Sequence, residues 1–134
     1  MKVYDKAKWH KEEIAHNKQL AYVHIGFFLA WCLNRGFAGQ LFTDDADEDF
    51  QHFIKGKITG PQLIELLDGV LDNEMLNDEA NEFAEMYYDN YLDQYEQIFQ
   101  KDGGFYSILD TNENYNRAEK LIDKLYSEWS RLNG

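Results

Sequence analysis

The sequence has one cysteine and one proline in 134 residues. The single cysteine, Cys32, excludes an internal disulfide, and its place in an apolar run predicts a buried thiol in a reducing compartment. With Pro61 as the lone proline and no low-complexity linker, no domain boundary is visible. We therefore expect residues 1–134 to form one domain, for which 44% apolar and 16% aromatic residues supply enough core.

Basic residues and long apolar runs are also scarce. There are 13 Lys and Arg against 25 Asp and Glu, a net charge of −12. This balance disfavours direct binding of nucleic acid or of an anionic membrane, because both are contacted chiefly through Lys and Arg. The longest apolar stretch, residues 21–33, is interrupted by His24 and is shorter than the roughly 20 residues of a membrane span. No secretion-signal pattern is visible, so a cytoplasmic protein is expected.

Helical periodicity dominates what is present. The spacing of apolar residues predicts helices over 78–100 and 112–132, and shorter ones over 44–55 and 61–67. Residues 18–35 are apolar almost all round, which is typical of a helix surrounded by others, and Gly36 is expected to end that helix. Residues 105–109 are the only β-like run and are expected to be an extended connector. The predicted fold class is all-α: a single-domain bundle of five or six helices with a buried central helix at about 18–35.

The negative charge is concentrated in the middle of the chain. Residues 37–100 contain two basic and sixteen acidic residues, whereas residues 1–36 and 101–134 are close to balance. Like charges at helical spacing cost a few tenths of a kcal/mol per pair, so helix stability does not explain them. The residues singled out as a partner-binding surface are Asp44, Asp45, Asp47, Glu48, Asp49, Asp72, Glu74, Asp78, Glu82, Glu85 and Asp89.

No catalytic or metal motif survives inspection. Residues 45–49 begin like a calcium loop, but Phe50 and Gly56 stand where Gly and Glu are required. His10 and His16 are six residues apart, whereas a zinc peptidase needs four. A histidine in an apolar helix, as His24 is, is more often a hydrogen-bonded core residue than a ligand. We expect no enzymatic activity, no cofactor and no metal.

Two segments of the chain resemble a known family: residues 4–10 (YDKAKWH) and residues 21–31 (AYVHIGFFLAW), the latter continuing to Arg35 and Gly36. The family consists of small acidic all-helical bacterial proteins, some of which occur as immunity proteins beside polymorphic or contact-dependent growth-inhibition toxins. The likeness extends more weakly through residues 68–69, 87–88, 91–92 and 110–111 to Trp129. Between Trp9 and Leu20 this chain departs from the family, with a mixture of basic and acidic residues of its own, so the local structure of the family is not carried over to this segment. Within the resemblance, Trp9, His10, His24, Gly26 and Trp31 look like positions that determine the fold.

The resemblance and the acidity together predict an immunity protein. Its partner would be a cognate basic toxin with a nuclease domain, an RNase ahead of a DNase, whose active site or substrate groove is occluded by the acidic face. One alternative is a small enzyme or ligand-binding protein with a pocket near His24, Trp31 and the tyrosine stripe Tyr87–Tyr95, although that stripe is most simply core packing. A second alternative is an acidic adaptor protein, whose negative charge serves only to keep it in solution.

Overall fold

The computed structural model describes residues 2–10 and 18–133. Over these residues the chain forms six α-helices and a two-stranded sheet, joined by short 3-10 turns. The helices are α1 (Val23–Asn34), α2 (Leu41–Asp44), α3 (Asp47–Ile54), α4 (Gly60–Leu66), α5 (Asp78–Ile98) and α6 (Asn112–Asn133), and the strands are β1 (Val3–Lys6) and β2 (Val70–Asp72). The predicted fold class, a helical bundle, is confirmed. None of the described helices combines the length and the apolar character that crossing a membrane requires.

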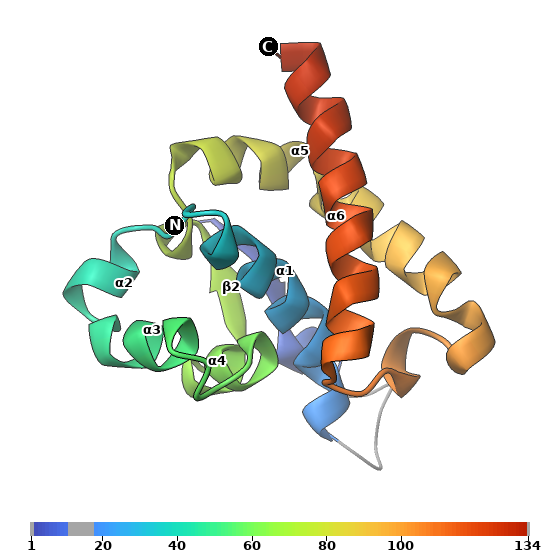
Figure 1. The fold of residues 1–134 in the computed structure, drawn as a ribbon, viewed down its shortest axis with the longest axis horizontal. Helices are drawn as coiled ribbons and strands as arrows, with labels where there is room; N and C mark the ends of the chain where they lie inside the picture. Colours follow the sequence, from blue (N-terminus) through green and yellow to red (C-terminus); the bar gives the residue numbers. More distant parts are fainter. Residues whose placement is uncertain (1, 11–17, 134) are drawn as a thin grey trace.

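Helix α1 is the buried centre, as predicted. Every residue from Val23 to Leu33 is buried, and Figure 1 shows α2, α3 and α4 on one side of this helix and α6 on the other. The predicted start at residue 18 is a 3-10 turn, Lys18–Ala21, and the α-helix begins only at Val23. Gly36, at φ +81°, follows its C-terminal end in the left-handed conformation that glycine adopts without strain.

Helix α4 packs directly on α1 through glycine. A Cβ atom added to Gly26 would lie 2.2 Å from both the N and the Cα atom of Pro61, so the two backbones touch at a distance that no other residue permits. Thr59 caps α4 through a capping box with Gln62, and Pro61 lies in the first turn, as the sequence predicts. Gly26 is therefore a fold-determining position.

Helices α5 and α6 close the core over the other side of α1. The ring of Phe83 on α5 packs between Trp31 of α1, at a centroid distance of 5.6 Å, and Tyr126 of α6, at 5.4 Å. The side chain of Asn77 caps α5, and that of Thr111 accepts a hydrogen bond from the Asn114 N–H in the first turn of α6. Both long helices lie within two residues of their predicted bounds.

Other expectations need correction. The sheet was not predicted, because strands of four and three residues are too short to show an alternation of apolar and polar residues. The two strands run antiparallel, with Asp5 opposite Leu71 and Lys6 opposite Val70. The helix expected over 44–55 is α3, which begins three residues later, at Asp47, and Asp44 instead ends the short helix α2, which was not predicted. The connector at 105–109 contains a 3-10 turn, Phe105–Ser107.

Trp9 differs from the other expected core positions. Its side chain is 56% exposed, whereas Trp31 is 1% exposed. Trp9 lies at the end of a 3-10 turn, Ala7–Trp9, with the Lys6 ammonium 5.9 Å from its ring centroid. His16, considered above together with His10, lies outside the described residues.

Candidate functional site

The acidic residues of two separate segments meet on one surface. Asp44 and Asp45, at the end of α2, line a hollow of about 630 Å³ together with Glu74 and Asp78, which lie thirty residues further along the chain. Because α2 and the 3-10 turn Asn73–Met75 both contact this hollow, the fold brings together charges that the sequence keeps apart.

This surface continues along α5. A second hollow shares Asp78 with the first and adds Glu82 and Glu85, and a third shares Glu85 and adds Asp89. We call this continuous surface the acidic groove; its acidic members are Asp44, Asp45, Glu74, Asp78, Glu82, Glu85 and Asp89.

Little positive charge neutralises the acidic groove. Lys2 forms an ion pair with Glu85, with 3.4 Å between Nζ and Oε1, and both side chains are about half exposed. Within the described ranges, no other member of the groove forms an ion pair. One cation therefore faces seven carboxylates, and the groove has a strong excess of negative charge.

The remaining residues singled out from the sequence lie outside the groove. Asp47, Glu48 and Asp49 form the first turn of α3, where carboxylates are favoured by the helix dipole. Asp72 is only 8% exposed, and its carboxylate accepts a hydrogen bond of 2.9 Å from the Glu74 N–H, so it serves the backbone turn. The groove therefore contains seven of the eleven residues predicted for partner binding.

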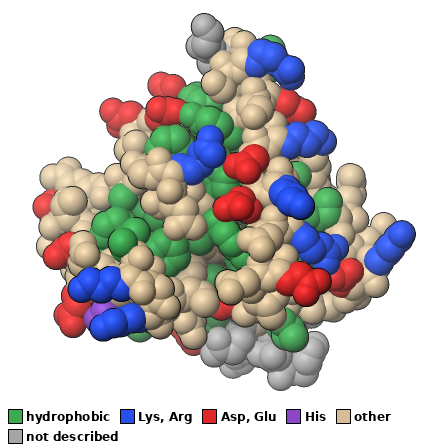
Figure 2. Space-filling view, viewed as in Figure 1, with side chains coloured by type: hydrophobic (Ala, Val, Ile, Leu, Met, Phe, Trp, Pro, Cys, Tyr) green, Lys and Arg blue, Asp and Glu red, His purple; other side chains and the backbone are tan. Residues whose placement is uncertain are grey.

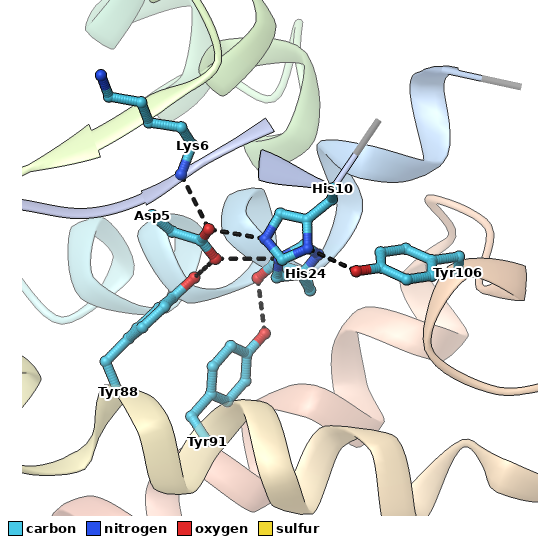
Figure 3. A network of polar contacts seen from close by, with 7 residues as sticks. All are labelled: Asp5, Lys6, His10, His24, Tyr88, Tyr91 and Tyr106. Carbon is cyan, nitrogen blue, oxygen red and sulfur yellow. Dashed lines mark hydrogen bonds and ion pairs between the residues drawn. The ribbon is translucent and has the colours of Figure 1, made fainter. Parts of the chain in front are cut away.

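A second cluster lies inside the protein, and the sequence analysis did not assemble it. Asp5, on β1, is 2% exposed, and both of its carboxylate oxygens face histidines. Oδ1 lies 2.7 Å from His10 Nε2, and Oδ2 lies 3.1 Å from Nε2 of His24 on α1 (Figure 3). The Lys6 N–H donates to Oδ1 and the Tyr88 hydroxyl, from α5, donates to Oδ2. We call Asp5, His10 and His24 the Asp–His–His cluster.

The second nitrogens of the two histidines have different surroundings. His10 Nδ1 lies 2.6 Å from the hydroxyl of Tyr106. His24 Nδ1 is buried without a hydrogen-bond partner in the described part of the chain, and so is the Tyr95 hydroxyl on the neighbouring ring, 6.1 Å away between centroids. The backbone carbonyl of His24 accepts a hydrogen bond of 2.7 Å from Tyr91.

The environment sets the charges in this cluster. Burial raises the pKa of Asp5, but the hydrogen bonds from His10 and His24 outweigh that effect and hold the pKa well below its usual range. Burial lowers the pKa of His24, and the hydrogen bond to Asp5 offsets this only in part. At neutral pH the core therefore contains an ionised carboxylate beside a neutral imidazole.

The pocket considered near His24 and Trp31 is occupied by the protein itself. His24 packs against the rings of His10 and Phe105, and Trp31 against those of Phe37 and Tyr126. Of the tyrosine stripe, Tyr88, Tyr91 and Tyr95 are buried and Tyr87 is half-buried, in keeping with core packing. Cys32 is buried, and burial raises the pKa of its thiol, which disfavours the reactive thiolate.

Comparison with known proteins identifies a family without assigning a role. A family model described as a domain of unknown function, DUF7832, matches residues 3–108. The chain belongs to the DUF7832 family. No curated protein and no solved structure matches it. The acidic groove and the Asp–His–His cluster both lie within the matched DUF7832 range, and α6 lies outside it.

The sequence contained only part of the signal for these two sites. The excess of acidic residues over 37–100 indicated the groove, but not that α2 and α5 share it. The spacing of the Asp–His–His cluster gives no recognisable pattern in the sequence. His10 follows Asp5 by five residues and His24 follows His10 by fourteen, and neither spacing matches a helical metal-binding motif. The signal that could have found the cluster is the occurrence of three of the protein's four histidines, together with Asp5, within the first 24 positions.

Proposed function

We propose that this DUF7832 protein is an immunity protein, which binds a cognate bacterial toxin and neutralises it. In this proposal the acidic groove occupies the basic active site or substrate groove of a nuclease toxin. The observation that carries the proposal is the convergence of Asp44, Asp45, Glu74 and Asp78 in one hollow that continues along α5. The proposal requires no catalysis by this chain, and its place of action would be the cytoplasm, where such a toxin meets nucleic acid.

The physical basis is electrostatic complementarity. A nuclease binds phosphates with Lys and Arg, so its cleft presents a positive surface. Carboxylates held in a groove of the opposite sign steer such a partner and raise the association rate toward about 10⁸ M⁻¹s⁻¹ at low salt. The mutual repulsion of the groove residues is relieved when the partner's cations neutralise them.

The groove is also held in place before any partner arrives. The Asn81 amide on α5 donates hydrogen bonds to the carbonyls of Asn73 and Leu76, at 2.9 and 3.0 Å. The Tyr4 hydroxyl of β1 donates to Asn81 Oδ1 at 2.8 Å. These bonds fix the turn before α5 against the helix itself, which lowers the ordering cost of binding.

The deciding experiment is co-expression with a nuclease toxin domain encoded by a neighbouring gene, scored by cell survival and by pull-down; the absence of any such gene would itself count against the proposal. Wild-type protein is expected to protect and to co-purify with the toxin. A variant with Asp44→Asn, Asp45→Asn, Glu74→Gln and Asp78→Asn is expected to fold and to protect less well. A matched control, Asp47→Asn, Glu48→Gln, Asp49→Asn and Glu65→Gln, removes the same charge outside the groove and is expected to retain more protection.

Two outcomes would contradict the proposal. If wild-type protein neither protects nor co-purifies with the toxin, the immunity function is wrong for this partner. If protection is intact in both variants at every ionic strength tested, the acidic groove is not the binding surface, and its charge serves solubility.

A further inference from the structure

The Asp–His–His cluster has the composition of a metal centre, although the sequence analysis expected none. Asp5, His10 and His24 each offer one ligand atom, and these three atoms all lie within 4.8 Å of one another. One carboxylate and two imidazoles are a ligand set for zinc and related divalent ions. We propose that Asp5, His10 and His24 bind one divalent transition metal ion, of which Zn²⁺ is the best match. This inference is independent of the proposed function.

The distances between the Asp5 oxygens and the histidine nitrogens are those of a site in which hydrogen bonds join the ligands to one another. Two ligands of a tetrahedral zinc ion are about 3.3 Å apart, given bonds of about 2.0–2.1 Å. The separations here are 2.7 Å from Asp5 Oδ1 to His10 Nε2 and 3.1 Å from Asp5 Oδ2 to His24 Nε2, slightly shorter, as hydrogen bonds require. One ligand atom from each of the three residues lies within 4.8 Å of the others, so small movements of the side chains bring them around one ion. Binding replaces the two bridging protons by the metal. In a neutral ring the proton moves from Nε2 to Nδ1, and none is released.

The charges of the cluster suit a cation. Asp5 and His24 are buried, with side chains 3% and 1% exposed, so the carboxylate lies in surroundings where a bound cation would be held strongly. No Lys or Arg side chain in the described ranges forms an ion pair with Asp5; Lys6 reaches it only through its backbone N–H. The carboxylate is therefore a buried anion whose negative charge no fixed cation balances.

The surrounding residues provide the outer contacts that metal sites use. The Tyr106 hydroxyl, 2.6 Å from His10 Nδ1, accepts the proton of that nitrogen when Nε2 binds a metal (Figure 3). Tyr88 and the Lys6 N–H fix the carboxylate. His24 Nδ1 has no partner in the described structure, so the proton that metal binding at Nε2 would place on this nitrogen calls for a buried water as its acceptor.

Three protein ligands leave a fourth position for water or another ligand. Of the three ligand side chains that of His10 is the most accessible, at 14% exposed, whereas those of Asp5 and His24 are enclosed. A metal ion can therefore enter from the His10 side.

A titration of chelator-treated protein with Co²⁺, a spectroscopic substitute for Zn²⁺, tests the proposal. We expect strong visible absorption that saturates at one Co²⁺ per chain and disappears when Zn²⁺ is added. His10→Gln should abolish it, and His52→Gln, which changes a histidine on α3 outside the cluster, should leave it intact. Tyr106→Phe should weaken Zn²⁺ binding about 10–100-fold through loss of the outer hydrogen bond.

Thermal unfolding keeps the test decisive if a variant fails to fold. Zn²⁺ is expected to raise the unfolding midpoint of the wild type and of His52→Gln relative to chelator, because a ligand that binds only the folded state stabilises it. The midpoint of His10→Gln should not change. Absence of a saturable Co²⁺ band in the wild type, equal binding by His10→Gln, or no Zn²⁺ shift in the wild-type midpoint would each overturn the proposal and leave a hydrogen-bonded network only.

Discussion

Helices α5 and α6 have 21 and 22 residues, and they pack against each other over the same side of α1. Helix α5 contains seven acidic and no basic residues, whereas α6 contains four of each. Figure 2 shows Lys, Arg and acidic side chains intermixed over α6. In α6 opposite charges stand four residues apart, as Glu113 and Arg117 do, a spacing that supports a helix, and Arg117 also contacts Asp102 in the preceding 3-10 turn at 2.5 Å. Helix α5 carries repulsion that its own stability does not require, and the proposed function gives this charge a role in binding.

The largest expected effect concerns the core that the two helices share. Trp31→Ala removes a ring that packs against Phe83 of α5 and Tyr126 of α6 and whose indole N–H donates to Asp123 at 2.8 Å. We expect a loss of about 3–5 kcal/mol in the free energy of unfolding, measured by denaturant titration. Trp9→Ala is the control, with a change within about 0.5 kcal/mol because Trp9 is exposed. Equal effects of the two substitutions would contradict the assignment of Trp31 to the core.

The second prediction separates the two helices by charge. Asp78→Asn, Glu82→Gln and Asp89→Asn together remove three charges from α5 and spare Glu85, which pairs with Lys2. Association with the toxin domain, measured by stopped flow, should slow by about one decade or more at low salt, and the difference should shrink as salt screens charges beyond about 8–10 Å.

The matched α6 variant is Glu113→Gln, Glu119→Gln and Glu128→Gln, with the same change in net charge. It should associate nearly as fast as the wild type. Equal slowing by both sets would show that only net charge matters and would remove the distinction between α5 and α6.

A smaller effect is expected where the helices are joined. The Tyr126 hydroxyl on α6 donates a hydrogen bond to Glu79 on α5. Tyr126→Phe should lower the free energy of unfolding by about 0.5–1.5 kcal/mol. Tyr87→Phe on α5, whose hydroxyl has no hydrogen-bond partner among the described residues, should leave it unchanged. If Tyr126→Phe is equally silent, this bond does not hold the two helices together.

The smallest effect is a difference in sign. Asp93→Asn relieves repulsion from Asp89 and Glu96 on α5 and should stabilise the protein by a few tenths of a kcal/mol. Glu113→Gln on α6 removes an attraction to Arg117, four residues on, and a favourable charge in the first turn, and it should destabilise by a similar amount. The denaturant midpoints of the two variants, each compared with that of the wild type, measure these changes in stability. A change of the same sign in both variants would contradict the difference in charge between α5 and α6.

Much of the helical architecture could be predicted from the sequence. The long periodic segments of α5 and α6, the apolar run of α1 and the cap at Thr59 all carry local signals, and the structure has them where they were expected. The sheet could not be predicted, because Asp5 and Leu71 are far apart in the chain and their strands are too short to show alternation. Trp9 was expected to be a fold-determining position on resemblance alone, and its side chain is exposed.

By itself, the sequence determined where the helices form and how much negative charge the middle of the chain carries, because periodicity, capping and composition are local properties. Only the tertiary structure decided which charges act together. It placed Asp44 beside Asp78 in one groove, enclosed Asp72, and brought Asp5 between His10 and His24. The first depends on the contact of α2 with the 3-10 turn Asn73–Met75, and the others on the pairing of β1 with β2 and the packing of β1 near α1. Residues distant in sequence meet in these contacts, and no local pattern encodes them.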